Sequence, residues 1–241
     1  MSTPQHPDPE QHNSCIGIVG GMGAIATCYV VETVLRCSGG QTDSSYPRVL
    51  VDFNSTVPSR TDAILGNGES PAPVVSSSLQ TLADAGATVL GIACNTVHHF
   101  LPAITLPPGT VFVNIVETAL SAVTHHWASA RIGLLQSPGA ASVSFWSNAL
   151  KACPQVDVVT ATPEQQRRVT EAIDCVKAGE TISADLINDV SQTIQHMKVD
   201  AVLIGCTELS MAFRNKLPVP EIDTTELFAQ ELINVWNQQQ G

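Results

Sequence analysis

The sequence predicts an α/β protein made of two similar lobes, each a parallel sheet flanked by helices. Two observations lead to this fold class. Short runs that are apolar along their whole length alternate with longer segments of helical periodicity, which is typical of parallel sheets covered on both faces. In addition, two stretches of the first half of the chain are echoed in the second half. With 44% hydrophobic and 14% charged residues, the 241-residue chain can bury such a core without disulfides.

The individual elements follow from this alternation. The predicted strands are short and rich in valine, isoleucine and leucine, and they cover 15–20, 48–53, 88–93, 111–115, 131–136, 155–160 and 200–205. The predicted helices carry a helical apolar pattern and cover 24–37, 71–86, 96–103, 116–128, 139–151, 163–178, 182–197 and 224–238. Residues 1–14 are polar and rich in proline, and we expect them to form a disordered lead-in.

The two halves of the chain resemble each other at two places. The stretch CIGIVGGMG (15–23) is echoed by RIGLLQSPG (131–139), and ATVLGIACNT (87–96) is echoed by DAVLIGCTEL (200–209). Either match alone fits a chance similarity between apolar strands. Because both occur in the same order and at nearly the same separation, we interpret the chain as duplicated lobes related by an approximate twofold axis. The first lobe is predicted at 15–123 and the second at 124–223, with the crossing at 124–130.

Charge and cysteine usage exclude several classes of protein. The chain carries 11 basic and 22 acidic residues, and its net charge of −11 repels phosphate backbones, so no nucleic-acid partner is expected. No apolar run approaches the ~18 residues of a membrane span, and the start has no apolar signal core, so we expect a cytoplasmic protein. The seven cysteines are an odd number without C-x-x-C spacing, which favours free thiols over disulfides or a zinc site.

Two of these cysteines stand where predicted strands end. Cys94 and Cys206 each follow an apolar strand and begin a polar segment, CNT and CTE, and ligands of open α/β sheets bind beyond the carboxyl ends of the strands. In lobes related by twofold symmetry, we expect the two thiols to face each other across a cleft. One thiol can then remove a proton from a carbon while the other delivers a proton to the opposite face, which inverts the stereocentre. The other five cysteines are interpreted as structural.

Several polar side chains near these strand ends can hold a small acidic substrate. Those that offer hydrogen bonds beside the thiols are Asn95, Thr96 and Thr207. The planar guanidinium of Arg60, in the loop after an earlier strand, suits bidentate capture of a carboxylate, although a solvated surface arginine is the alternative. Lys177 either contacts the substrate or compensates a helix dipole. Glu208 either supports the second thiol or is a first-turn helix acid.

The sequence gives little support for a metal or a cofactor. The turn Gly21-x-Gly23-x-x-Ala26 fits a dinucleotide loop, but the acidic residue expected about 20 positions later is missing from its place. The amides of this turn can instead cradle a carboxylate. His98 and His99 are adjacent in a predicted helix and point in different directions, so they lack metal-ligand spacing. We expect one of them to brace the site.

The ordered set GIVGGMG, VPSRT, ACNT and GCTEL, within residues 15–230, resembles the aspartate/glutamate racemase superfamily, on its aspartate racemase side. This resemblance implies two Rossmann-like lobes, an active site between them, no cofactor and often a homodimer. In some relatives the chain end returns to the first lobe, and we expect the segment 224–241 to do so here. The resemblance also implies that Cys94 and Cys206 work as opposing bases.

Matched motif by motif, the resemblance implies roles for further residues. Those expected to contact the substrate are Met22, Gly23, Arg60, Asn95, Thr96, Lys177 and Thr207, and Glu208 is expected to support the second thiol. The sequence departs from the family pattern at Ser59, where relatives often carry an acidic residue, and near Ala140, where relatives commonly carry a threonine. Glutamate racemases usually begin the first turn with an Asp-Ser pair, so Gly21-Met22 argues against that branch.

Residues and resemblance together predict a cofactor-independent racemase that interconverts L- and D-aspartate. Two alternatives stay open. One is a related thiol enzyme acting on another acidic amino acid or a dicarboxylate, such as a glutamate or broad-specificity racemase, an isomerase or a decarboxylase. The other is a module that binds an amino acid in the cleft without turnover. The expected partner is a small acidic amino acid, with no role for nucleic acid, membrane or metal.

Overall fold

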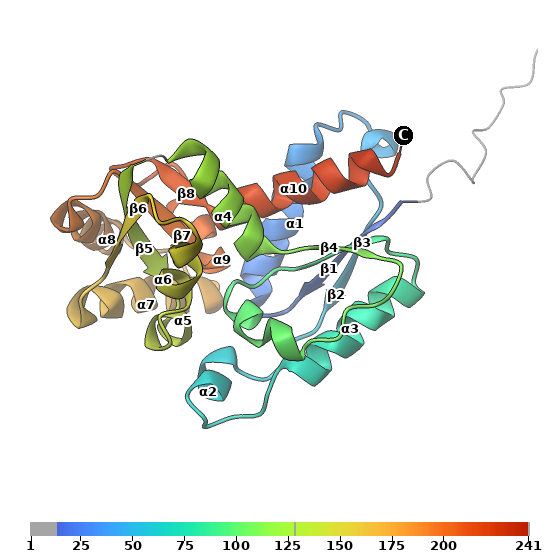
Figure 1. The fold of residues 1–241 in the computed structure, drawn as a ribbon, viewed down its shortest axis with the longest axis horizontal. Helices are drawn as coiled ribbons and strands as arrows, with labels where there is room; N and C mark the ends of the chain where they lie inside the picture. The colour runs from blue at the N-terminus through green and yellow to red at the C-terminus, as the bar shows by residue number, and fades with distance from the viewer. Residues whose placement is uncertain (1–13, 128, 241) are drawn as a thin grey trace, which may run out of the picture.

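The structure, a computed structural model, describes residues 14–127 and 129–240. It contains two four-stranded parallel sheets, each flanked by helices (Figure 1). The first sheet has the strand order β2-β1-β3-β4, and the second has the order β6-β5-β7-β8. The predicted fold class, α/β with two similar lobes, is therefore confirmed. The predicted lead-in lies outside the described residues, apart from its last residue.

Along the chain, helical segments follow every strand of the two sheets. The first sheet contains β1 (Ile16–Gly20), β2 (Val49–Phe53), β3 (Val89–Ile92) and β4 (Val111–Val113), and its helices are α1 (Ala24–Ser38), α2 (Arg60–Ile64), α3 (Ala72–Asp84) and α4 (Ile115–His126). The second sheet contains β5 (Ala130–Gln136), β6 (Val156–Thr160), β7 (Ala201–Gly205) and β8 (Glu221–Asp223). The helices that follow them are α5 (Pro138–Ser142), α6 (Phe145–Ala149), α7 (Pro163–Lys177), α8 (Ala184–Met197), α9 (Thr207–Phe213) and α10 (Thr224–Gln238).

The sequence echo corresponds to equivalent places in the two sheets. Gly17 pairs with Leu90 between β1 and β3, and Gly133 pairs with Val202 between β5 and β7. Strands β1, β3 and β7 are buried along their whole length, which explains why they read as continuous apolar runs. As a result, Cys94 follows β3 at the place where Cys206 follows β7.

Several elements differ from the sequence-based expectation. The segment Thr96–Ala103 is a 3₁₀ helix and contains Pro102 near its end. The helix predicted at 139–151 is interrupted at Ser144, whose φ of 51° is left-handed, so α5 and α6 are separate. Helix α2 and strand β8 were not predicted, because five and three residues are too short for a periodic pattern.

The hydrophobic core continues from one sheet to the other. One cluster of buried side chains includes Ile16 of β1, Ile115 of α4, Ile132 of β5 and Phe228 of α10. Helix α10 leaves the second sheet after β8 and packs against α1, α4 and β3. The exact lobe boundaries stay a prediction. Among the described residues, the structure contains no helix that is both long and apolar enough to cross a membrane.

Gly91 allows α10 to pack closely on β3. A Cβ atom at this position would lie 2.4 Å from Cζ of Phe228, which is far inside van der Waals contact. We expect Gly91→Ala to lower the free energy of unfolding by about 1–3 kcal/mol through overpacking. Urea unfolding measures this loss. The double variant Gly91→Ala/Phe228→Leu should recover part of it, and a Gly91→Ala protein as stable as the wild type would contradict the packing.

Candidate active site

A small cavity lies between the lobes, at the carboxyl ends of the central strands of both sheets. The residues that line it follow β1, β2, β3, β5 and β7 or belong to α7, and its volume is about 50 Å³. The predicted site residues that line it are Met22, Arg60, Cys94, Asn95, Thr96, Lys177, Cys206, Thr207 and Glu208. The lining also includes residues that were not predicted to contact a substrate, namely Ser59, Thr61, Ser137 and Ile173.

Cys94 and Cys206 approach this cavity from different lobes. Both side chains are buried, with 5% and 6% exposed, and neither forms a disulfide. Cys206 is the N-cap residue of α9, and its carbonyl accepts hydrogen bonds from the amides of Leu209 and Ser210 at 3.0 and 3.1 Å. Of the described residues, no other cysteine lines the cavity. The structure thus brings together the two thiols that the sequence echo singled out.

The surroundings of Cys206 keep its thiol protonated. Burial raises the pKa of Cys206 well above its usual value, and the Glu208 carboxylate and a negative charge on Cys94 raise it further, whereas Lys177 lowers it. The thiol donates to Oε2 of Glu208 at 3.1 Å. Because charge on one cysteine opposes charge on the other, the arrangement disfavours two thiolates at the same time. Such a pair can act as an acid and a base.

Glu208 extends from the second lobe to the first-lobe turn. Its side chain is 3% exposed, and Oε2 also accepts a hydrogen bond from the Thr207 hydroxyl at 3.2 Å. The other oxygen, Oε1, lies against Gly23, where an added Cβ would be only 2.4 Å away. Gly23 was predicted to contact the substrate, but it does not line the cavity in the structure. It makes room for the carboxylate of Glu208.

Arg60 places a positive charge at the cavity without a counter-ion from the described residues. Its guanidinium donates to the carbonyl oxygens of Val57, Pro58 and Met22 at 3.4, 3.1 and 3.2 Å. These contacts fix the side chain, and no carboxylate of the described chain pairs with it. Lys177, the last residue of α7, lines the same cavity. The two cations suit an anionic ligand.

Polar groups of both lobes complete the cavity. Asn95 is 2% exposed, and neither atom of its amide has a hydrogen-bond partner within the described chain. The hydroxyl groups of Thr96 and Ser137 lie 2.8 Å apart and join the lobes. A buried amide without partners is costly, so Asn95 is poised for a ligand. Ser137 follows β5 in the turn that echoes the Met22 turn, and this echo was the signal that could have identified it.

The glycine turn that resembled a dinucleotide loop is filled by its own chain. The Gly21 amide donates to the Thr27 hydroxyl at 2.9 Å, so it does not point to an anion. An added Cβ at Gly21 would lie 2.4 Å from the backbone of Asn54. Within residues 14–127 and 129–240, no group of three or more His, Cys, Asp or Glu side chains is placed to hold a metal ion. The Gly21 amide is therefore not free to hold a phosphate group.

His98 braces the backbone at Cys94. Its Nδ1 lies 2.8 Å from the carbonyl oxygen of Cys94, and because a carbonyl only accepts, Nδ1 carries the proton. Burial lowers the pKa of His98 from 6.5 to about 4, although hydrogen bonds to the backbone of Cys94 and Asn95 partly raise it. The imidazole is therefore neutral at physiological pH. His98 does not line the cavity, so it contacts the backbone of Cys94 rather than a ligand.

This burial gives a pH-dependent contribution to stability. The folded pKa of His98 is below the unfolded value, so the contribution is present above pH 6.5 and is lost as the pH falls toward 4. The 2.5 pH units between these values correspond to about 3 kcal/mol. Asp223 has the opposite pH dependence. Burial raises its pKa from 3.8 to about 6, so its contribution to stability is present below pH 3.8 and is lost as the pH rises through 6.

The contribution of His98 is therefore measured as a difference between wild type and His98→Gln. We expect the difference in the free energy of unfolding to shrink by about 3 kcal/mol between pH 7 and pH 4. Urea unfolding at several pH values measures it, and Asp223 cancels because both proteins contain it. A difference that is constant over this range would contradict a neutral, buried His98.

Comparisons with known proteins agree with this geometry. The sequence pattern of the Asp/Glu/Hydantoin racemase family matches residues 19–232, and the chain belongs to this family. The family places the chain among amino-acid racemases, which are isomerases.

Solved structures show the same fold. An aspartate racemase from Picrophilus torridus has a TM-score of 0.83 and 24% sequence identity, over 93% of this chain and 94% of that chain. An aspartate racemase homologue from Pyrococcus horikoshii OT3 has a TM-score of 0.71 and 19% identity, over 93% and 99% of the two chains. A glutamate racemase from Francisella tularensis, solved with D-glutamate, has a TM-score of 0.64 and 14% identity, over 95% and 82%. All three are similar to this chain in overall architecture.

Proposed function

We propose that this protein is a cofactor-independent aspartate racemase that uses Cys94 and Cys206 as its two acid–base groups. The observation that carries this proposal is the presence of two buried cysteines, from equivalent positions of two lobes, on one small cavity. Racemisation needs a base on one face of Cα and an acid on the other. Two side chains that come from opposite lobes can meet this requirement. Membership of the racemase family supports the same reaction class.

The substrate is proposed to be held by positively charged side chains and by neutral polar groups. The side-chain carboxylate of aspartate is proposed to bind Arg60, which is fixed by three carbonyl contacts and has no anionic partner among the described residues. Lys177 adds a second positive charge at the cavity. The α-carboxylate is proposed to bind the Asn95 amide and the hydroxyl pair of Thr96 and Ser137. This binding places Cα between the thiols.

The reaction then removes one proton from Cα and adds one proton to the opposite face of Cα. In one direction, the thiolate of Cys94 takes the proton from Cα, and the thiol of Cys206 gives its proton to the opposite face. The electron pair stays on Cα and its carboxylate until the new C–H bond forms, and the product leaves Cys94 as a thiol and Cys206 as a thiolate. In the other direction the two roles exchange. Glu208 raises the pKa of Cys206, which makes its thiolate a stronger base.

Chiral analysis of aspartate incubated with the reduced, purified protein tests this function. We expect L- and D-aspartate to approach equal amounts from either side, without added cofactor, and glutamate to react more slowly. A parallel panel of glutamate, asparagine, alanine and small dicarboxylic acids identifies the alternative thiol enzymes. Racemisation of another member of the panel but not of aspartate would overturn the substrate assignment. Stabilisation by aspartate without any turnover would overturn the enzyme assignment.

A further inference from the structure

A second cavity lies at the C-terminal end of α9, the helix whose N-terminal end carries Cys206. It has a volume of about 680 Å³ and shares no lining residue with the active-site cavity. The end of α4, the segment after α9, strand β8 and the start of α10 form its walls. In Figure 1, α4, β8 and α10 lie above α9, whereas α2 and α5 of the candidate active site lie below it. The two cavities are therefore separate sites.

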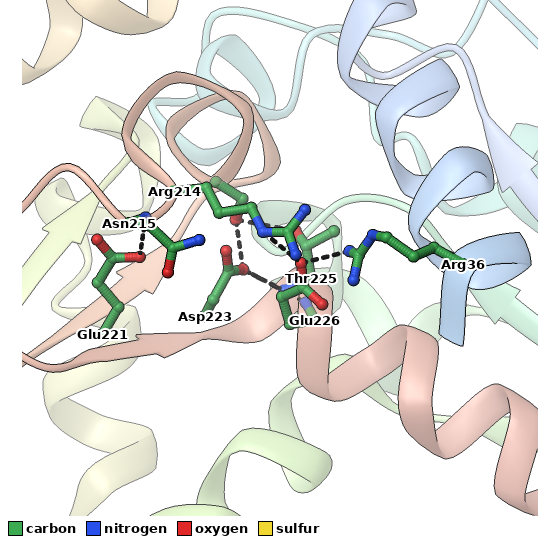
Figure 2. A network of polar contacts seen from close by, with 8 residues as sticks. Arg36, Arg214, Asn215, Glu221, Asp223, Thr225 and Glu226 are labelled. Atoms are coloured by element: carbon green, nitrogen blue, oxygen red, sulfur yellow. Dashed lines mark hydrogen bonds and ion pairs between the residues drawn. The ribbon is translucent and has the colours of Figure 1, made fainter. Parts of the chain in front are cut away.

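The polar wall of this cavity contains a buried carboxyl group that is only half satisfied. Asp223 is 7% exposed, and its Oδ1 accepts hydrogen bonds from the Ser210 hydroxyl at 2.6 Å and from the amides of Thr225 and Glu226 at 2.8 and 3.4 Å. Its Oδ2 has no partner among the described residues. Figure 2 shows this free oxygen on the side of Asn215, which also lines the cavity. A buried oxygen of this kind favours a ligand that donates a hydrogen bond.

The charges around Asp223 favour a cationic donor. Glu226 accepts from Arg36 at 2.5 Å and from Arg214 at 3.0 Å, so one carboxylate occupies both guanidinium groups (Figure 2). Among the described residues, the Glu221 carboxylate accepts only from the amides of Asn215 and Leu217, at 3.0 and 3.2 Å. Asp223 and Glu221 thus line the cavity without an ion pair to a described residue, and Arg214, which also lines it, is paired with Glu226. The wall retains an excess of negative charge.

The remaining wall is apolar and can hold a hydrocarbon body. The apolar side chains that line it are Trp127, Leu217, Val219, Ile222 and Leu227. The volume is large enough for a ring-sized group, and apolar walls with a few placed polar groups are typical of small-molecule sites. The cavity therefore combines a buried acceptor, a net negative charge and an apolar surface.

We propose that this cavity is a second binding site, for a small molecule that carries an ammonium group on an apolar body. The ammonium group donates to the free oxygen of Asp223, and the body lies against Trp127 and Leu227. Burial raises the pKa of Asp223 to about 6, with partial opposition from the hydrogen bonds of Ser210, Thr225 and Glu226. The carboxyl group is still ionised at pH 8, where binding should be measured. The site is independent of the proposed racemase chemistry, because it uses neither cysteine.

Titration of the full-length protein with 2-phenylethylamine tests the site. Two probes of similar shape, neutral 2-phenylethanol and anionic 3-phenylpropionate, separate charge from hydrophobic contact. We expect saturable binding of the amine, and binding about tenfold or more weaker for the alcohol, since a charge-assisted hydrogen bond is lost. Isothermal titration calorimetry gives the affinities. Trp127 fluorescence gives a local signal, which the Trp127→Phe variant should lose.

Three variants connect the binding to this cavity. Asp223→Asn should weaken the amine about tenfold or more, whereas Asp185→Asn, an exposed acid in the first turn of α8, should leave binding unchanged. Asp223 also caps α10, so Leu227→Ser provides a second test that leaves the Asp223 hydrogen bonds in place. It should weaken the amine several-fold. Urea unfolding confirms that each variant is folded.

The competing explanations give different results. Absence of saturable amine binding to the wild type, or equal binding of amine and alcohol, would overturn the proposal. Full amine affinity in a folded Leu227→Ser protein would do the same. Displacement of the amine by aspartate would place it in the active-site cavity instead. Each of these readouts is a binding measurement, so a failed racemase assay does not affect them.

Discussion

Replacement of Cys94 or Cys206 by alanine is expected to lower racemisation of aspartate by about 100- to 10,000-fold. Each thiol serves one face of Cα, so loss of either removes the proton acceptor in one direction and the proton donor in the other. The two variants should therefore lose activity in both directions. Chiral analysis of L- and D-aspartate, each used separately as the starting material, measures the loss.

A matched variant separates chemistry from general thiol loss. Cys175, a half-buried cysteine on α7, does not line the cavity. Cys175→Ala should therefore keep its kcat, and binding of aspartate should persist in the Cys94→Ala and Cys206→Ala proteins. If both of those variants racemise aspartate at the wild-type rate, the two-thiol mechanism is wrong.

Replacement of Arg60 by glutamine is expected to lower kcat/KM for aspartate by about 100-fold or more, because a hydrogen-bonded charge pair with the substrate is lost. The guanidinium would no longer neutralise the side-chain carboxylate. Arg60→Lys keeps the charge but loses the planar fork, so its effect should be intermediate. Steady-state kinetics with both enantiomers measures the change.

The proposed specificity role of Arg60 has its own readout. In Arg60→Gln, the ratio of kcat/KM for aspartate to that for asparagine should fall. Aspartate loses the charge pair between its side-chain carboxylate and Arg60, whereas the neutral amide of asparagine has no such pair to lose. Arg167→Gln, at an exposed position on α7, is the matched control and should leave the ratio unchanged. A ratio that stays at the wild-type value in Arg60→Gln would show that Arg60 only anchors its loop.

The fold could be predicted to a large extent because buried parallel strands have a distinct sequence pattern. Strands such as β1 and β7 are apolar along their length, and a turn and a helix follow each of them. Strand β8 and helix α2 could not be predicted, because they are short and their positions depend on tertiary contacts. The break at Ser144 likewise depends on a backbone conformation that composition does not reveal.

The candidate site could be predicted where the two lobes repeat each other. Cys94 and Cys206 occupy equivalent positions, so the echo in the sequence was enough to pair them. The same echo places Ser137 in the turn equivalent to that of Met22, but its contact with Thr96 could not be predicted, because it exists only when the lobes meet. Gly23 was assigned to the substrate, whereas its contact in the structure is Glu208. The homodimer and the cytoplasmic location stay predictions.

Racemisation of L-aspartate in D₂O tests the two-thiol account most directly. The thiol that protonates Cα exchanges its hydrogen with solvent, and it is a different group from the one that removes the substrate proton. At low conversion, D-aspartate should therefore carry one deuterium at Cα, while the remaining L-aspartate should stay largely protiated. Mass spectrometry of the separated enantiomers gives both values. D-aspartate that retains the original Cα proton would contradict the account.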